Sequence, residues 1–536
     1  MCYHHKHKLH FVREGSTISF KMRAVSFLIS VLLFICGCGL NKPPKSTLRY
    51  DISGSPATLD PQYANRQSEL AIINNSFEGL TAISPEGNVI PAAAESWEVS
   101  TDKKSYTFTL RDDIKWSNGD AVTAEDFVFG LRRLFNPVAF SDAADDYLMI
   151  KNASAILYEG KSAHLLGVKA LSEKELLIEL EYADPSILTL LSRSSASPCQ
   201  KEFFDDQKGK YGLSAKNVIC NGPFIIDSWG EDYVVILKNP QYREKIAIDG
   251  VNLYFNRGDG VERFLEAKTD ACLIPFYRFG ETKGLSGEMF YDQSWLMLFN
   301  RQKDILCSTE VRKAFLAAFD KGEMLSDIPE YLKPYNGAIA PDAMMGGICY
   351  RDEAKLPTAA PLPCDARSAF FEAMEQLERN SRGKLSIIVS DFEPGPNIGG
   401  QLLKEWQQKL SAYVNMEQLA YQQLIDRTQR GDFDIAIAPL VSQSDSLIDR
   451  FRLIEALEPE GDTTLSDILS AARQQPDTAK SAKLLSKAEQ YIIDQYIALP
   501  LFCSPSLFSL GEGIEGVYYN DINGTVYFAD AICSRD

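Results

Sequence analysis

The residues that could carry out catalysis are few once their positions are considered. Four of the five histidines, His4, His5, His7 and His10, precede a hydrophobic leader, so His164 is the only histidine in the body of the chain. Ser-His-Asp and Cys-His hydrolases and His-rich zinc sites need a base or ligand whose pKa is near neutrality. The sequence therefore predicts that the protein is not an enzyme and has no metal site or cofactor.

Two other patterns fit surface structure better than chemistry. Gly160-Lys161-Ser162 ends like a phosphate-binding loop, but Ala155 stands where such a loop has its first glycine. The paired carboxylates at 112–113 and 145–146 are more typical of solvated faces than of an acid and base pair. An enzyme stays the minor alternative.

Cysteine is the remaining reactive residue type. Beyond Cys38 there are eight cysteines, and in an oxidising compartment four disulfides among them allow 105 connectivities. Cys199 and Cys220 bracket a glycine-containing loop, so we predict that they form a disulfide. Free buried thiols are the open alternative.

Residues 1–37 have the pattern of a leader that contains a signal peptide. Translation is expected to start at Met22. Lys21 and Arg23 precede about twelve mostly apolar residues, a run too short to span a bilayer. The run ends in Ile35-Cys36-Gly37-Cys38, which resembles a bacterial lipobox. We predict that Cys38 becomes the lipidated N-terminal residue and that residues 38–47 form a tether. A plain secretory leader and an uncleaved anchor remain alternatives.

Length and charge limit the class of the mature protein. A chain of 536 residues implies two or three packed lobes. The formal net charge is −18, and without residues 1–37 it becomes about −22 by the same counting. Such an acidic body is repelled by phosphate backbones, so we expect no nucleic-acid partner.

Interleaved helix and strand patterns indicate an α/β protein. Residues 105–111 alternate with period two, and Thr123 has the position of a helix cap for a helix that runs towards Arg133. Further strands are expected at 48–52, 176–180 and 233–238, and further helices at 70–77, 312–319, 401–410 and 479–493.

A dense series of short motifs then carries a resemblance. The series begins with Thr58-Leu59-Asp60-Pro61-Gln62 and Phe77-Glu78-Gly79-Leu80, continues through Trp116-Ser117-Asn118-Gly119-Asp120, and recurs late in Gly431-Asp432-Phe433-Asp434 and Leu499-Pro500-Leu501-Phe502. In these motifs, over about residues 48–530, the chain resembles the family 5 extracellular solute-binding proteins of the oligopeptide-binding type.

The resemblance implies a fold and a function. The fold is an α/β, two-lobed periplasmic-binding-protein-like clamp with an additional inserted α/β domain. Lobe I would be 48–77, 206–292 and 506–536, the extra domain 78–205, and lobe II 293–505. The function is capture of peptides for an ABC importer, with its permease and ATPase subunits as partners. We expect a monomer attached to a bacterial membrane through its N-terminal lipid, on the periplasmic side or at the cell surface. Adhesion, sensing or a non-peptide solute are alternatives.

Family members hold the main chain of a peptide as an extra strand between two protein segments. By ungapped matching, the first segment falls on Asn65, Arg66 and Gln67, and a ring that often covers the ligand falls on Tyr421. The second segment runs over Pro439, Leu440, Val441, Ser442 and Gln443.

The second segment departs from the family pattern. Gln443 stands where the oligopeptide binders have the Asp that pairs with the ligand's α-ammonium, and Asp445 follows two residues later. A glutamine cannot neutralise a buried ammonium. Two interpretations stay open: Asp445 has moved into the role, or the ligand has a blocked amino end, as in a cell-wall peptide fragment.

Overall fold

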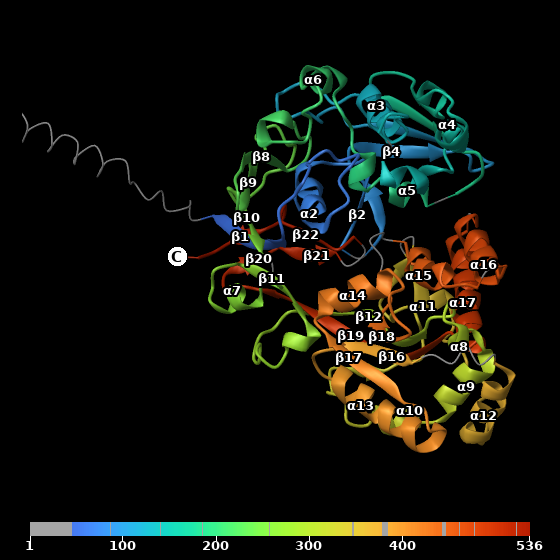
Figure 1. Ribbon diagram of the computed structural model, residues 1–536. Coiled ribbons are helices and arrows are strands. Elements are labelled where there is room, and N and C mark those ends of the chain that lie inside the picture. The colour runs from blue at the N-terminus through green and yellow to red at the C-terminus, as the bar shows by residue number, and fades with distance from the viewer. Residues whose placement is uncertain are drawn as a thin grey trace, which may run out of the picture. The chain divides into compact units, whose positions relative to one another are not determined.

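The computed structural model describes residues 46–535 except 86, 140, 185, 257, 346–347, 378–383, 442–445, 460, 476 and 521–522. Cys38 and the predicted ligand residues Ser442, Gln443 and Asp445 therefore lie outside the described residues. Ser46–Arg535 forms one compact unit in which helices and strands are interleaved, as the sequence predicts (Figure 1).

The first hydrophobic core is built on two four-stranded sheets. The first sheet has the order β1-β10-β9-β8, with β1 (Thr47–Ser53), β10 (Gly250–Asn256), β9 (Tyr233–Lys238) and β8 (Phe224–Trp229). Strands β1 and β10 pair in parallel, and the other neighbours pair antiparallel. The sheet β4-β5-β7-β6 is antiparallel: β4 (Ala94–Val99), β5 (Ser105–Leu110), β7 (Glu175–Glu179) and β6 (Val168–Ala170). Alternate residues of β5 are buried, as its period-two pattern predicts.

The same part of the chain forms short helices. They are α2 (Gln67–Ser76), α3 (Ala124–Leu134), α4 (Ala153–Glu159), α5 (Ile187–Leu190), α6 (Lys201–Asp206) and α7 (Val261–Leu265), together with the 3₁₀ turns η1 (Asp142–Tyr147) and η3 (Ser194–Ala196). Helices α2 and α3 contact strands of these two sheets, whereas α7 packs in a small separate cluster with Cys272 and Ile274. The predicted cap of α3 is confirmed, because Thr123 forms a capping box with Asp126. Strands β2 (Thr81–Ile83) and β3 (Val89–Pro91) form a separate hairpin.

The second core surrounds a seven-stranded sheet with the order β11-β19-β12-β18-β16-β17, in which β13 also pairs with β19. The strands are β11 (Ala271–Pro275), β12 (Glu288–Phe299), β13 (Lys333–Pro334), β16 (Leu385–Ser390), β17 (Val414–Leu419), β18 (Ile435–Pro439) and β19 (Ala498–Leu510). The long strand β19 thus lies between β11 and β12, although it is the last of the three in the chain.

The helices of this half include the amphipathic segments that the sequence predicts. They are α8 (Asp304–Cys307), α9 (Thr309–Ala317), α10 (Lys321–Met324), α11 (Tyr350–Glu353), α12 (Ala366–Gln376), α13 (Gly395–Glu405) with a π turn at Trp406–Leu410, α14 (Tyr421–Gln429), η8 (Ile448–Phe451), α15 (Arg452–Ala456), α16 (Thr464–Arg473) and α17 (Thr478–Asp494). The indole of Trp406 is fully buried and donates to Phe315 O at 2.9 Å, which joins α13 to α9.

The two cores divide the chain unequally along its sequence. Residues 48–271 and 508–531 supply the first core, while Phe276 and residues 295–502 supply the second. Strand β19 enters both, with Phe502 in the second core and Phe508 in the first. The first core runs continuously into residues 78–205, so the assignment of that range to a separate extra domain stays a prediction.

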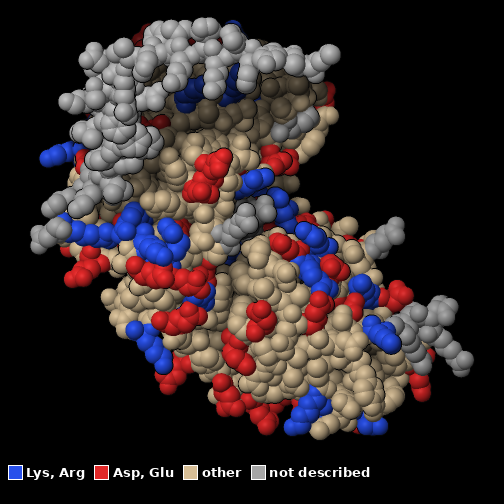
Figure 2. All heavy atoms as spheres, turned by 60° about the vertical axis from the view of Figure 1, so that its left-hand side comes forward, with Lys and Arg blue, Asp and Glu red and all other residues tan. Residues whose placement is uncertain are grey.

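The surface is mixed in charge. Acidic side chains are scattered among basic and uncharged ones over the face that Figure 2 shows. Among the described residues, none of the helices has both the length and the apolar composition needed to cross a membrane.

Candidate functional site

A cavity of about 510 Å³ lies between elements of the two cores. From the first core it is lined by the loop before α2, by α2, by η1, by residues 189–195 and by Asn523. From the second core it is lined by Gln429 at the end of α14, by Val441 after β18, and by η8 and α15. The volume is in the range of small-molecule binding sites.

The loop before α2 is held from the inside by one buried carboxylate. Glu69 is 1% exposed, and its Oε2 accepts hydrogen bonds from the backbone N–H groups of Asn65 and Arg66, both at 3.0 Å. Its Oε1 accepts from Ala57 N at 2.9 Å and Thr58 N at 3.3 Å. Four backbone donors on one carboxylate fix the path of the loop and place Asn65 at the cavity.

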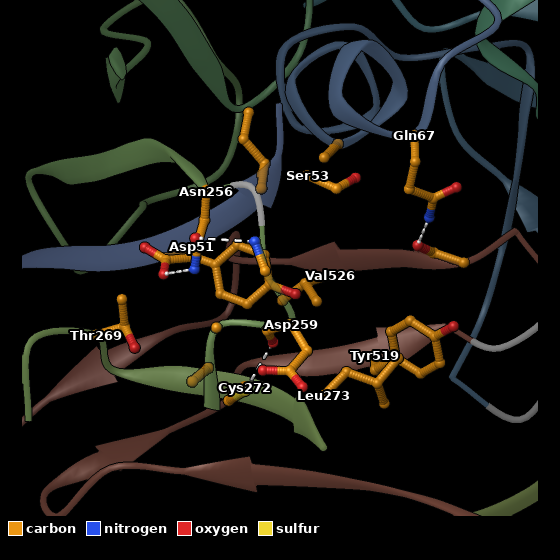
Figure 3. A pocket seen from close by; sticks show the side chains of 17 residues that line it. Asp51, Ser53, Gln67, Asn256, Asp259, Thr269, Cys272, Leu273, Tyr519 and Val526 are labelled. Atoms are coloured by element: carbon orange, nitrogen blue, oxygen red, sulfur yellow. Dashed lines mark hydrogen bonds between the residues drawn. The ribbon is translucent and has the colours of Figure 1, made fainter. Parts of the chain in front are cut away.

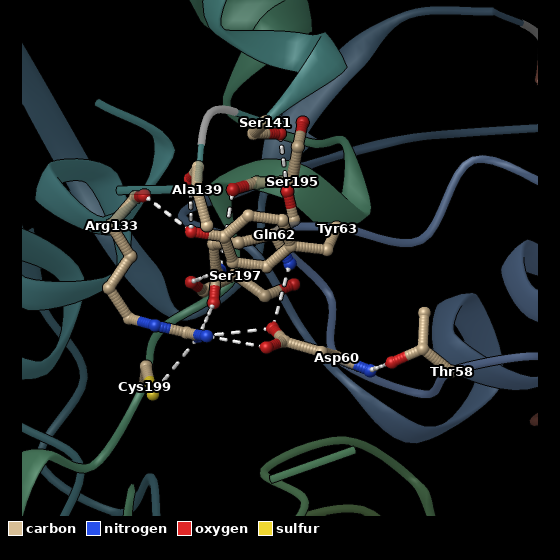
Figure 4. Close-up of polar contacts among 10 residues, drawn as sticks. All are labelled: Thr58, Asp60, Gln62, Tyr63, Arg133, Ala139, Ser141, Ser195, Ser197 and Cys199. Atoms are coloured by element: carbon tan, nitrogen blue, oxygen red, sulfur yellow. Dashed lines mark hydrogen bonds and ion pairs between the residues drawn. The ribbon is translucent and has the colours of Figure 1, made fainter. Parts of the chain in front are cut away.

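A buried ion pair also holds this loop in place (Figure 4). Arg133 of α3 donates from Nη1 to Asp60 Oδ1 at 3.0 Å and from Nη2 to Asp60 Oδ2. Its guanidinium also lies 4.2 Å from the ring centroid of Phe204. Both charges are buried, so the pair fixes geometry more than it adds free energy.

Gln62 connects this anchor to the cavity wall. Its Nε2 donates to Ser197 O at 2.9 Å and Ser195 O at 3.3 Å, and its backbone oxygen accepts from Ser141 Oγ at 2.5 Å (Figure 4). Ser141 immediately precedes η1, and Ser195 lines the cavity. The motif at residues 58–62 therefore positions two parts of the cavity wall, which is a structural reason for its residue types.

The wall from the first core carries charge. Asp142 and Asp146 come from η1, and Arg193 comes from the segment after α5. Arg193 Nη1 lies 2.8 Å from Asp146 Oδ2, and Asp142 Oδ2 accepts from Asn65 Nδ2 at 2.8 Å. Asp146 belongs to a carboxylate pair that the sequence indicated as a solvated face; it is partly exposed and lines the cavity beside an arginine.

The wall from the second core is balanced in charge. Asp449 Oδ1 lies 3.1 Å from Arg452 Nε and 3.5 Å from Arg473 Nη2, and Arg473 is also 3.6 Å from Glu455. Sequence reasoning did not assign the charged residues of either wall to a binding site. They come from segments far apart in the chain, and no sequence motif links them.

The predicted first segment divides between two cavities. Asn65 lines the larger cavity, whereas Gln67 lines a smaller one of about 200 Å³ that is also lined by residues of β1 and β11 (Figure 3). Gln67 Nε2 donates to Gly524 O there. The carboxylates of the smaller cavity are neutralised, since Asp51 pairs with Arg263 at 2.8 Å and Asp259 with Arg278 at 3.0 Å.

Arg66 belongs to neither cavity. It is the N-cap residue of α2, and its side chain is 61% exposed.

The predicted second segment reaches the cavity at one described position. Val441 lines the cavity, while Pro439 and Leu440 are buried before it. Tyr421 does not line the cavity: its Oη accepts from Gln293 Nε2 at 3.0 Å, and its ring lies 5.7 Å from that of Tyr277. Burial raises the pKa of Tyr421.

The predicted disulfide is not formed in the structure. Cys199 and Cys220 are free, buried thiols. Cys199 Sγ accepts a hydrogen bond from Arg133 Nη1 at 3.5 Å. The backbone N–H of Cys220 donates to Ser117 Oγ at 3.2 Å. Burial raises the pKa of both thiols to about 12, which makes them inert. The prediction from their spacing is corrected in favour of the alternative.

The chain matches a protein-family model over residues 88–451, that of the bacterial extracellular solute-binding proteins, family 5 Middle. It is 26% identical over 534 residues to a protein named "Probable deoxycholate-binding periplasmic protein YgiS" of Escherichia coli, covering 94% of this chain and 97% of that one. It is 23% identical over 532 residues to the oligopeptide-binding protein OppA of Bacillus subtilis, with the same coverages.

Solved structures give the same fold. The substrate-binding domain of an oligopeptide ABC transporter from Bacillus anthracis superposes with a TM-score of 0.69 at 25% identity, covering 91% of this chain and 99% of that one. OppA of Listeria monocytogenes bound to peptide gives a TM-score of 0.69 at 21% identity, with the same coverages. These likenesses confirm the predicted fold class, a multi-domain α/β clamp.

Proposed function

Because the chain belongs to the family 5 bacterial extracellular solute-binding proteins, we propose that it captures peptides in the cavity between its two cores and delivers them to the permease of an ABC importer. The cavity carries this proposal. It has the volume of a ligand site, and it combines Asn65 of the first predicted strand-pairing segment with Val441 of the second. Relatives named for oligopeptide binding support the ligand class.

Two main-chain segments suit a ligand that varies in sequence. An extended peptide that pairs with backbone N–H and C=O groups gains affinity without side-chain selectivity. The asparagine side chains of the lining, Asn65, Asn74 and Asn523, add both donors and acceptors for peptide groups. We expect low selectivity among peptides of two to five residues, and cell-wall peptides fall within this class.

The N-terminal leader completes the proposal. A lipid on Cys38 would hold the protein at a bacterial membrane beside the permease, with residues 38–47 as the tether. Adhesion or sensing by the same fold is the competing function. It would need no permease or ATPase subunits.

The test is titration calorimetry of the processed protein against a mixed set of dipeptides to pentapeptides, with deoxycholate as a separate arm. Identification of the co-purified ligand by mass spectrometry accompanies it. Peptide binding supports the proposal. Silence towards every peptide, together with binding of deoxycholate or of another co-purified solute, would overturn it.

A pair of valine variants connects binding to the cavity. Val441→Tyr places a ring in the cavity and should lower peptide affinity at least about tenfold, since a blocked site loses a kcal/mol or more. Val138→Tyr is the control, because Val138 is 91% exposed and lies outside the cavity. Equal affinities for both variants, with unchanged circular dichroism, would place the ligand elsewhere.

A further inference from the structure

Among the described residues, the charged side chains that line the larger cavity are paired with one exception. Arg193 pairs with Asp146, and Arg452 pairs with Asp449. Among the described residues, Asp142 accepts one side-chain hydrogen bond, from the amide of Asn65, and no lysine or arginine forms an ion pair with it. The described lining therefore contains one carboxylate, that of the exposed Asp142, with no described lysine or arginine partner.

Asp142 is held in a defined place. It is the first residue of η1, which Ser141 caps by accepting from Ala143 N at 3.2 Å. Asn65 orients the carboxylate from the other side, and its own backbone is fixed by Glu69. A carboxylate has about four acceptor sites, so the single amide donor leaves room for a ligand group.

The smaller cavity shows what a satisfied acidic lining looks like in this protein. Its two carboxylates, Asp51 and Asp259, each pair with an arginine. The negative charge of each of these carboxylates is already neutralised by a protein arginine, without a cation from a ligand. The contrast singles out Asp142, which faces the larger cavity with an amide as its only described partner.

We propose that Asp142 binds a primary ammonium group of the ligand, which makes it a specificity-determining residue of the cavity. The inference rests on the proposed peptide-binding function. An ammonium group carries the charge that the lining lacks and donates three hydrogen bonds, enough for the carboxylate oxygens of Asp142 and the amide oxygen of Asn65. The ammonium is either the amino end of the peptide or a lysine side chain.

Gln443 stands where the oligopeptide binders have the Asp that pairs with the ligand's α-ammonium. That glutamine cannot supply a negative charge, whereas Asp142 supplies one from the wall formed by the first core. A ligand with a free ammonium group therefore needs no acid at position 443.

Asp145 provides a matched control. It belongs to the same turn η1, is exposed, has no described cation partner and accepts from Tyr158 Oη at 2.8 Å, but it does not line the cavity. Asp142→Asn and Asp145→Asn remove the same charge within three residues of each other. A general effect of net charge would therefore appear equally in both variants.

The experiment measures Kd by calorimetry for trialanine, N-acetyl-trialanine, Ala-Lys-Ala and N-acetyl-Ala-Lys-Ala on the wild type and both variants. We expect the wild type to prefer a peptide that has the bound ammonium group over the matching peptide that lacks it by roughly 30-fold or more. Asp142→Asn should abolish this preference, and Asp145→Asn should keep it. The acetylated lysine peptide shows which ammonium is bound.

Several outcomes would contradict this role of Asp142. Equal loss of affinity in Asp142→Asn for peptides with and without a free ammonium group would overturn the inference and make Asp142 a closure contact. An equal loss of preference in both variants, or a wild type that ignores acetylation and lysine, would also overturn it. If no peptide binds the wild type, the proposed function itself fails, and the ammonium assignment fails with it.

Discussion

Lys321 is a half-buried amine whose described partners are all neutral oxygens. Its Nζ donates to Tyr335 O at 2.8 Å, Asn336 Oδ1 at 2.8 Å and Pro500 O at 2.5 Å. Burial lowers its pKa to about 8, whereas the unfolded chain keeps a value of about 10.4. Between these values the unfolded state binds more protons, so the contribution of Lys321 to stability rises with pH.

This predicts a pH-dependent difference between the wild type and Lys321→Met. The free energy of unfolding of the wild type, relative to the variant, should increase by roughly 2 to 3 kcal/mol between pH 8 and pH 10. Urea unfolding at several pH values measures it, with Lys487→Met, an exposed lysine, as the control. A difference that stays constant with pH would contradict the lowered pKa.

Cys38 carries a prediction that belongs to its immediate neighbours in sequence. Cys38 has glycine before it and an apolar residue three positions before it, whereas Cys36 follows the bulky Ile35. Cys38→Ala should therefore abolish labelling by radioactive palmitate and release the protein from membranes, and Cys36→Ala should change neither. Labelling that persists in Cys38→Ala would refute the lipid assignment.

At the scale of elements, helix α3 holds the loop before α2 through Arg133. Arg133→Met leaves the carboxylate of Asp60 buried without a cation, which should cost about 3 to 5 kcal/mol of stability. The adjacent Arg132 lies 3.9 Å from the exposed Glu125, so Arg132→Met should cost about 1 kcal/mol or less. Denaturant unfolding compares the two variants, and equal losses would show that the loop does not depend on the buried pair.

Elements with a strong local signal were predictable from the sequence. The alternation at 105–111 gave β5, and the cap at Thr123 gave the start of α3, because both depend on neighbours within a few residues. The motif at 58–62 indicated a family but not its contacts. Its partners Arg133, Ser141 and Ser197 are about 70 to 135 positions away, so the sequence has no local sign of them.

The candidate site was predictable only in its backbone segments. Matching to a family placed Asn65 and Val441 at the cavity, but it could not show that Gln67 turns to a second cavity or that Tyr421 packs among aromatic rings. The charged walls arise when η1, residues 189–195 and α15 meet in space. Tertiary packing brings these segments together, and the hydrophobic periodicity of the sequence does not predict their contact.

At the scale of the whole molecule, a cavity shared by two cores predicts closure on the ligand. Contacts from both walls can form together only when the walls approach, so binding favours the closed state. The radius of gyration by X-ray scattering should fall by about 1 Å from a value of roughly 23 Å when a bound peptide is added. In Val441→Tyr the same peptide should leave the radius unchanged. A wild-type radius that does not change at saturation would contradict closure.

The place of β19 has a consequence for the order in which the protein forms during synthesis. Its neighbours β11 and β12 leave the ribosome about 200 residues before it, yet β19 pairs between them and contributes to both cores. Until residue 510 has been made, the facing edges of those strands lack their shared neighbour, and such edges invite pairing with other chains. The sheet is therefore completed only at the end of translation. A nascent chain of this topology stays incompletely folded, and dependent on protection from aggregation, for almost the whole time that it is being made.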